Sequence, residues 1–112
     1  MTTSSKIAQF KKVLELDPQD ETLWFGLGKA YMDEERWQAA IEALETCIRI
    51  KPTYSAAYYA LAQAYYRNQD LSQCREICQR GREIAMTNGD LLVVKNLEQL
   101  ASVAEQTSPD HP

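Results

Sequence analysis

The side chains that could carry chemistry in this chain are few: three cysteines and a single histidine among 112 residues. A catalytic nucleophile needs a base placed beside it, and the only histidine, His111, stands in a proline-flanked stretch near the end of the sequence. Cys74 and Cys78 are four residues apart, so on a helix they would share one face as a thiol pair or half of a zinc site. Zinc needs four ligands, and we therefore interpret Cys47, Cys74 and Cys78 as small, buried apolar residues.

The remaining candidates for acid–base chemistry are two pairs of carboxylates, Glu34 with Glu35 and Glu42 with Glu45. Such pairs are common on the solvated face of a helix or a turn. The sequence places no catalytic partner and no phosphate-binding loop beside them. We therefore expect no catalytic residues, no cofactor and no metal, and the sequence does not predict an enzyme.

Charge and hydropathy exclude two classes of partner. The net charge is −4, with acidic and basic residues mixed along the chain, which argues against nucleic acid as the main partner. A basic run of Arg75, Arg80 and Arg82 is interleaved with Glu76 and Glu83, as expected for ion pairs on a helix surface. The longest apolar run is too short for a membrane span, and the first residues lack the apolar core of a secretory signal, so we expect a cytoplasmic protein.

The elements that must position these residues follow from an internal period of 34 residues. Leu27 recurs as Leu61, and Tyr31 recurs as Tyr65. A unit of this length, rich in helix-forming residues, is typical of a stacked helix–turn–helix repeat. Apolar spacing, prolines and capping residues predict six helices at about 4–16, 20–32, 37–50, 55–67, 72–86 and 90–106.

The residues within each unit resemble the tetratricopeptide repeat family over about residues 4–100. The first unit carries the family's order of side chains: Trp24, Leu27, Gly28, Tyr31, Ala40, Leu44 and Pro52. The second carries most of it, with Met86 where the proline would stand: Tyr58, Leu61, Ala62, Tyr65, Cys74 and Cys78. The resemblance implies an all-α, right-handed superhelix of antiparallel helix pairs in a single domain over residues 1–106. Its parts would be a half-repeat at 4–20, repeats at 21–54 and 55–88, a capping helix at 89–106 and a flexible tail at 107–112.

The same register predicts which side chains are buried. Trp24, Leu27 and Tyr31 fall at the spacing of one buried helix face, so Trp24→Ala is expected to cost about 3–5 kcal/mol, as for a truncated core aromatic. Gly81 lies within a helix, and we interpret it as a position of close packing. In the last helix, the family's Leu, Gly and Tyr become polar, as suits a terminal cap: Lys95, Asn96 and Gln99.

The resemblance also implies a concave groove lined by the first helix of each repeat. The groove positions fall on Thr22, Phe25, Lys29, Met32 and Asp33, and then on Ala56, Tyr59, Gln63, Tyr66 and Arg67. We expect this face to hold an extended peptide or a helix of a partner protein. Phe25, Tyr59 and Tyr66 would be apolar anchors, and Lys29 and Arg67 would bind acidic groups. The alternative is that some of these rings pack between helices as ordinary core.

One type of ligand is not predicted. Some family members hold the acidic C-terminus of heat-shock chaperones with Lys, Asn, Asn, Lys and Arg side chains on three first helices. The matching positions here are Phe25, Lys29, Ala60, Asp90 and Val94. Only Lys29 is basic, and Asp90 would repel a carboxylate, so we do not predict a receptor for chaperone C-terminal carboxylates.

A second possible function is structural, as a homodimer or a scaffold element. In the repeat register, Val93, Leu97 and Leu100 would face the groove, so helix 89–106 could cap the stack, fold across the groove or pack on a second copy. Phe10 and Val13 could leave a further open face on the first helix. If the chain is a dimer, replacing Leu97 and Leu100 by Glu is expected to make it monomeric.

Overall fold

The computed structural model describes residues 3–107, which form six α-helices and confirm the all-α prediction. The helices are α1 (Thr3–Leu16), α2 (Glu21–Asp33), α3 (Trp37–Ile50), α4 (Ser55–Arg67), α5 (Leu71–Asn88) and α6 (Leu91–Gln106). The first and last residues of each helix lie within two positions of those predicted from the sequence. The expected tail at 107–112, including His111, lies outside the described residues from position 108 onward.

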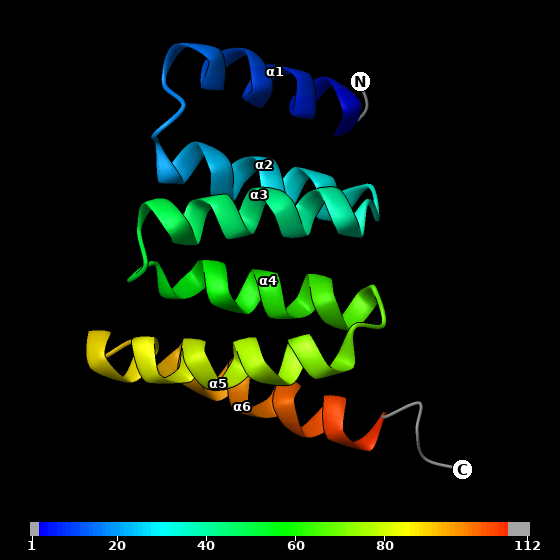
Figure 1. The fold of residues 1–112 in the computed structure, drawn as a ribbon, viewed down its shortest axis with the longest axis vertical. Helices are drawn as coiled ribbons and strands as arrows, with labels where there is room; N and C mark the ends of the chain where they lie inside the picture. Colours follow the sequence, from blue (N-terminus) through cyan, green and yellow to red (C-terminus); the bar gives the residue numbers. More distant parts are fainter. Residues whose placement is uncertain (1–2, 108–112) are drawn as a thin grey trace.

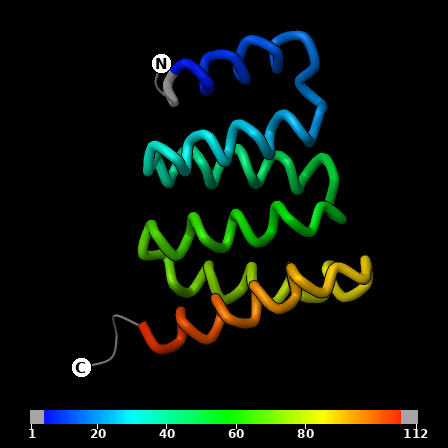
Figure 2. Tube along the Cα trace, turned by 180° about the vertical axis from the view of Figure 1, so that it is seen from behind, coloured from blue at the N-terminus to red at the C-terminus, as the bar shows by residue number. Residues whose placement is uncertain are grey.

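The helices stack as antiparallel neighbours along the long axis of a molecule measuring 45 × 33 × 20 Å (Figure 1). Each helix packs on the next one in the sequence, and α4 also contacts α6 and α2. Helix α1 packs on α2 alone among the described helices. In Figure 1 α5 lies in front of α6, and the view from behind in Figure 2 reverses this order. The first helices of the pairs, α2, α4 and α6, therefore share one side of the stack.

The turns inside the two helix pairs are copies of each other. Glu35 (φ 58°) and Gln69 (φ 65°) both adopt the left-handed conformation. The next amide in each turn closes the helix: Arg36 N donates to Tyr31 O at 3.0 Å, and Asp70 N to Tyr65 O at 2.9 Å. This is how helices commonly end, although glycine is the usual residue at the left-handed position.

An aromatic side chain at the same position in each repeat donates a hydrogen bond to a backbone carbonyl of the preceding loop. Trp24 Nε1 donates to Pro18 O at 2.8 Å, and Tyr58 OH donates to Pro52 O at 2.6 Å. Tyr58 is buried, with 2% of its surface exposed, but Trp24 is only half-buried because it also lines an open cavity between α1 and α3. The prediction that Trp24 is a full core residue is therefore wrong, and its truncation should cost less than the 3–5 kcal/mol typical of a buried aromatic.

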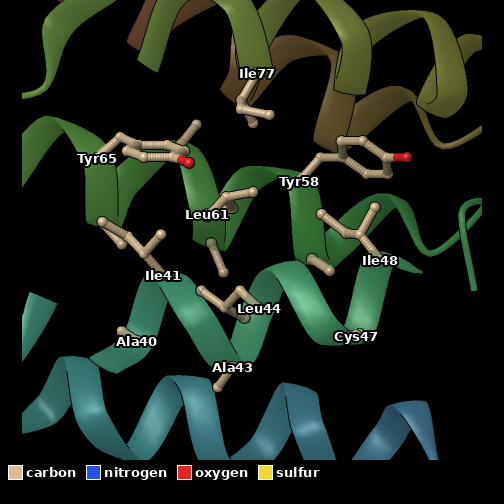
Figure 3. Packing of buried hydrophobic residues seen from close by; sticks show 14 of the residues in the cluster. Ala40, Ile41, Ala43, Leu44, Cys47, Ile48, Tyr58, Leu61, Tyr65 and Ile77 are labelled. Atoms are coloured by element: carbon tan, nitrogen blue, oxygen red, sulfur yellow. The ribbon is translucent and has the colours of Figure 1, made fainter. Parts of the chain in front are cut away.

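Close approach between the helices of a pair depends on small residues. A Cβ added to Gly28 would lie 2.6 Å from Leu44 Cγ, and one added to Gly81 would lie 2.5 Å from Tyr58 Cβ. The predicted close packing at Gly81 is thus confirmed. Figure 3 shows Leu44 pointing from the middle of α3 into the buried cluster.

One residue of helix α6 departs from the repeat register. Leu97, expected to face the groove, is fully buried, and an added Cβ at Gly81 would lie 3.0 Å from its Cδ1. Leu97 is buried where α6 packs closely on α5 at Gly81. Leu97→Glu would therefore disrupt the core rather than test for a dimer. Lys95 and Gln99 are exposed on the outer side of α6.

Polar contacts tie the α5–α6 corner to the loop between the two repeats. Asp90, the residue before α6, accepts a hydrogen bond from Ser55 Oγ at 2.5 Å. Asn88 Nδ2 donates to Thr53 O at 2.8 Å. These bonds link residues 35 positions apart, so they fix how the last helix pair sits on the preceding one.

The three cysteines are free and buried, as predicted. Burial is the main cause that raises the pKa of Cys47 from 9.0 to about 11. The pKa of Cys78 is also raised, first by its hydrogen bond with Cys74 and then by burial. The same hydrogen bond lowers the pKa of Cys74. Thiols held in their protonated form are poor nucleophiles and poor metal ligands, as is the case for Cys47 and Cys78, and all three side chains are buried in the core.

Candidate protein-interaction groove

Side chains from three of the helices and the start of a fourth converge on one cavity of about 320 Å³. Five residues predicted from the sequence as binding residues line it: Lys29, Met32, Gln63, Tyr66 and Arg67. Asp33, also expected at the groove, is there too. They meet because α2 and α4 are equivalent first helices that lie on the same side of the stack. Leu100 of α6 completes the lining, so α6 forms a wall of the cavity.

The other residues expected in the groove lie outside this cavity. Phe25 is half-buried and stacks on Tyr54, with ring centroids 5.1 Å apart and planes inclined by 30°. Tyr59 is half-buried and packs against the core. Thr22 and Ala56 are exposed near the first turns of α2 and α4. Phe25 and Tyr59 therefore have intramolecular partners, which the sequence analysis had left open as the alternative.

One aromatic residue of the groove was missed by the sequence analysis. Trp37, the first residue of α3, lines the cavity, and the Arg67 guanidinium lies 4.8 Å from its ring centroid. The available indication in the sequence was a tryptophan at the start of a predicted second helix, followed by a basic residue at the end of the next predicted helix. The contact fixes the Arg67 side chain at the cavity by a cation–π interaction.

A second hollow of about 400 Å³ adjoins the first and shares Tyr66 and Arg67 with it. Gln69, Leu71 and Thr107 complete its lining. The hydroxyl groups of Tyr66 and Thr107 lie 3.3 Å apart. The two neighbouring cavities, here called the groove, combine aromatic and aliphatic surface with Lys29, Arg67 and Asp33.

The positions that would hold a chaperone C-terminus are occupied by unsuitable groups. Ala60 and Val94 are buried apolar residues. The carboxylate of Asp90 is bonded to Ser55, and Phe25 is stacked on Tyr54. Lys29 alone of the five contributes a positive charge to the groove.

Residues 3–107 contain no group of three His, Cys, Asp or Glu side chains placed to hold a metal ion. Across the same described range, no helix is both long enough and apolar enough to span a membrane.

Comparison with known proteins places this fold in a family. A family model described as "Tetratricopeptide repeat" matches residues 31–91. A TPR repeat-containing protein of Pseudomonas aeruginosa is 33% identical over 91 residues, which cover 81% of this chain and 87% of that protein.

Solved structures agree with this assignment. The solution structure of a protein from Bordetella parapertussis superposes with a TM-score of 0.80 at 25% identity, covering 95% of this chain and 96% of that one. The TPR2B domain of yeast Sti1, solved in a complex with pHsp70, gives a TM-score of 0.88 at 16% identity, covering 93% and 83% of the two chains. The chain therefore belongs to the tetratricopeptide repeat family, whose domains are typically non-catalytic modules for protein–protein interaction.

Proposed function

We propose that this protein binds a peptide segment or a helix of a partner protein in the groove formed by α2, α4 and α6. The observation that carries the proposal is the convergence of Lys29, Met32, Gln63, Tyr66 and Arg67 on one cavity. Aromatic residues, Met and Arg are enriched at protein interfaces because they combine contact area with directional contacts. A groove of this composition accepts apolar side chains and has two cationic groups for acidic ones.

The charges indicate the kind of segment that fits. Lys29 and Arg67 outnumber Asp33 in the cavity, although the whole chain has a net charge of −4. A ligand with an acidic residue next to an aliphatic or aromatic one matches this distribution. Phe25 and Tyr59, one turn before the cavity on α2 and α4, would extend the contact as apolar anchors towards the other end of the groove.

Selection from a phage-displayed library of random peptides tests this function. The immobilised full chain is expected to enrich peptides with acidic and apolar residues. In Tyr66→Ala/Arg67→Ala, affinity for the selected peptides should fall at least about tenfold, or about 1.4 kcal/mol. Gln73→Ala/Gln79→Ala is the matched control, because both side chains are exposed on α5. Equal loss in both variants, or no loss in the groove variant, would contradict the proposal.

Self-association is a second candidate, supported by exposed leucines on α6. Leu91 and Leu92 are 68% and 70% exposed, which is unusual for two adjacent large aliphatic residues on a helix. Sedimentation equilibrium over a range of concentrations tests this alternative. A dimer that Leu91→Glu/Leu92→Glu converts to a monomer supports a scaffold role, and a monomeric wild type removes it.

A further inference from the structure

One face of α1 is apolar in its middle and charged at both ends. Lys6, Phe10, Val13 and Asp17 follow one another at intervals of four, three and four residues, which places them on one side of a helix. Asp17 comes directly after α1, and its N–H still donates to Val13 O at 3.1 Å, so the helical path continues to it. Val13 is 45% exposed, and Leu16 beside it is 86% exposed. We name the surface of Lys6, Phe10, Val13 and Asp17 the α1 face.

The equivalent faces of α3 and α5 are covered. The residues 34 positions after Phe10 and Val13 are Leu44 and Cys47 of α3, and neither has any exposed surface. Leu44 packs there against Gly28 of α2, and α4 covers the same face of α5. Among the described helices only α2 contacts α1, which lies at one end of the stack (Figure 1). The α1 face is therefore a packing surface without its covering helix in residues 3–107.

The charges show that the α1 face is adapted to a different neighbour from the faces of α3 and α5. The equivalents of Lys6 in α3 and α5 are Ala40 and Cys74, which have no exposed surface. A lysine buried in such a place would need a partner of opposite charge. Within residues 3–107, neither Lys6 nor Asp17 forms an ion pair. A helix that covers the α1 face must therefore supply one acidic and one basic group.

A second copy of α1 meets this requirement. Lys6 and Asp17 are equally far along the sequence from the midpoint between Phe10 and Val13. In an antiparallel pair of α1 helices with a two-fold axis at that midpoint, Lys6 of each copy lies opposite Asp17 of the other. Phe10 likewise lies opposite Val13, which is the reciprocity that an isologous interface requires. The remaining charged residues of α1 are on the other sides of the helix: Lys11, Lys12 and Glu15.

We propose that the protein forms a homodimer in which the α1 faces of two copies pack antiparallel. Phe10 and Val13 supply the apolar contact. The Lys6–Asp17 pairs fix the direction of the helices, because exposed ion pairs contribute more to specificity than to affinity. One face of a 14-residue helix is small beside the roughly 1,200–2,000 Å² of a stable interface. The dimer is therefore reversible and depends on the protein concentration.

The dimer keeps both peptide-binding surfaces open. No residue of α1 lines the groove, so two grooves are available in each dimer. A partner with two binding segments can occupy both, and its second segment then binds at a raised effective concentration. This dimer is separate from the association through Leu91 and Leu92, and it does not depend on what the groove binds.

Sedimentation equilibrium of the full chain over a range of concentrations measures the dimer dissociation constant. Val13→Glu should raise this constant at least about tenfold, because it places a carboxylate in the apolar middle of the interface. Ala8→Glu is the matched control, since it adds the same charge at an exposed position on the opposite side of the same helix. It should leave the constant unchanged. Far-UV circular dichroism checks that both variants keep the wild-type helix content.

A charge exchange tests the predicted pairing itself. Lys6→Glu should raise the dissociation constant at least about fivefold, since it turns both attractions across the two-fold axis into repulsions. Lys6→Glu/Asp17→Lys should return it to within about threefold of the wild type, because the exchanged charges meet again between the two copies. A variant that merely disturbs folding would not be restored in this way.

Four results would overturn the proposal. They are a wild type that is monomeric at all concentrations, an equal loss in Val13→Glu and Ala8→Glu, a charge exchange that restores nothing, and a dimer that only Leu91→Glu/Leu92→Glu dissociates. The last result would place the interface on α6. None of these measurements involves a groove ligand, so failure here leaves the peptide-binding function to be tested on its own.

Discussion

At the point where the two helices of a pair approach most closely, the two repeats have different pairs of buried residues. Replacing the pair of the first repeat by that of the second tests whether the two side chains are packed against each other. In the first repeat Gly28 faces Leu44, and the equivalent positions in the second hold Ala62 and Cys78, both buried. Gly28→Ala, Leu44→Cys and the double variant form a cycle that converts the first arrangement into the second. A Cβ on Gly28 would lie 2.6 Å from Leu44 Cγ and 2.7 Å from its Cδ2. Such a clash cannot be relieved by a small shift, because Leu44 has no exposed surface.

The expected magnitudes follow from the terms that each change alters. Gly28→Ala gains about 1 kcal/mol of helix propensity and loses about 1–3 kcal/mol through overpacking, so the net effect is a loss of up to about 2 kcal/mol. Leu44→Cys removes buried volume and should cost about 2–3 kcal/mol, towards the low end of large-to-small core substitutions. In the double variant, the new methyl group enters the space left by Leu44. The double variant should therefore be more stable than Leu44→Cys, by about 1 kcal/mol.

Urea denaturation followed by far-UV circular dichroism measures all four proteins of this cycle. We expect a favourable coupling energy of about 1–3 kcal/mol between the two substitutions. Additivity within about 0.5 kcal/mol would refute the packing argument. Gly26→Ala is the control, because its Cβ would meet the ring edge of Phe10 at 2.5 Å. Phe10 is only half-buried and can move, so this change should be neutral or stabilising.

Three further predictions concern the turns, the core thiols and the loop contacts. Gln69→Gly should raise the free energy of unfolding by about 1 kcal/mol, since glycine adopts the left-handed conformation without the cost paid by other residues; an unchanged urea midpoint would contradict this. The raised pKa of Cys47, about 11 against 9.0, means that the unfolded chain releases the thiol proton first, so stability present below pH 9.0 is lost as the pH rises towards 11. Cys47→Ala should remove part of that alkaline loss, as measured by urea midpoints across this pH range, and an identical pH profile would show that this thiol does not contribute. Trp24→Phe and Tyr58→Phe should each lower stability by about 1 kcal/mol through loss of one hydrogen bond, and thermal unfolding that matches the wild type would show that the bonds to Pro18 and Pro52 contribute little.

The sequence predicted the parts of the structure that depend on local periodicity. The 34-residue period and the breaks at Pro18, Pro52 and Gly89 located all six helices. The register also selected the residues of α2 and α4 that meet at the cavity, because equivalent positions on equivalent helices face the same way. Lys29 and Gln63 are one such pair, and both line it.

The features that the sequence analysis missed depend on contacts between distant segments. Leu97 is buried where α6 packs on α5 at Gly81, and no pattern within α6 shows this. Phe25 stacks on Tyr54, which lies in a loop whose path the period does not define. The bond from Ser55 to Asp90 joins residues 35 positions apart.

The attachment of α1 to α2 alone has a consequence for dynamics. Only Ile7 and Leu14 are fully buried among the described side chains of α1, and Leu16 is 86% exposed. In a linear array, a terminal element held by one neighbour is the least protected and undocks before the rest unfolds. Amide hydrogens of α1 should therefore exchange with solvent faster than those of α4. Since no residue of α1 lines the groove, undocking of α1 leaves the groove intact, and the fraction of molecules that can bind a ligand there does not depend on whether α1 is docked.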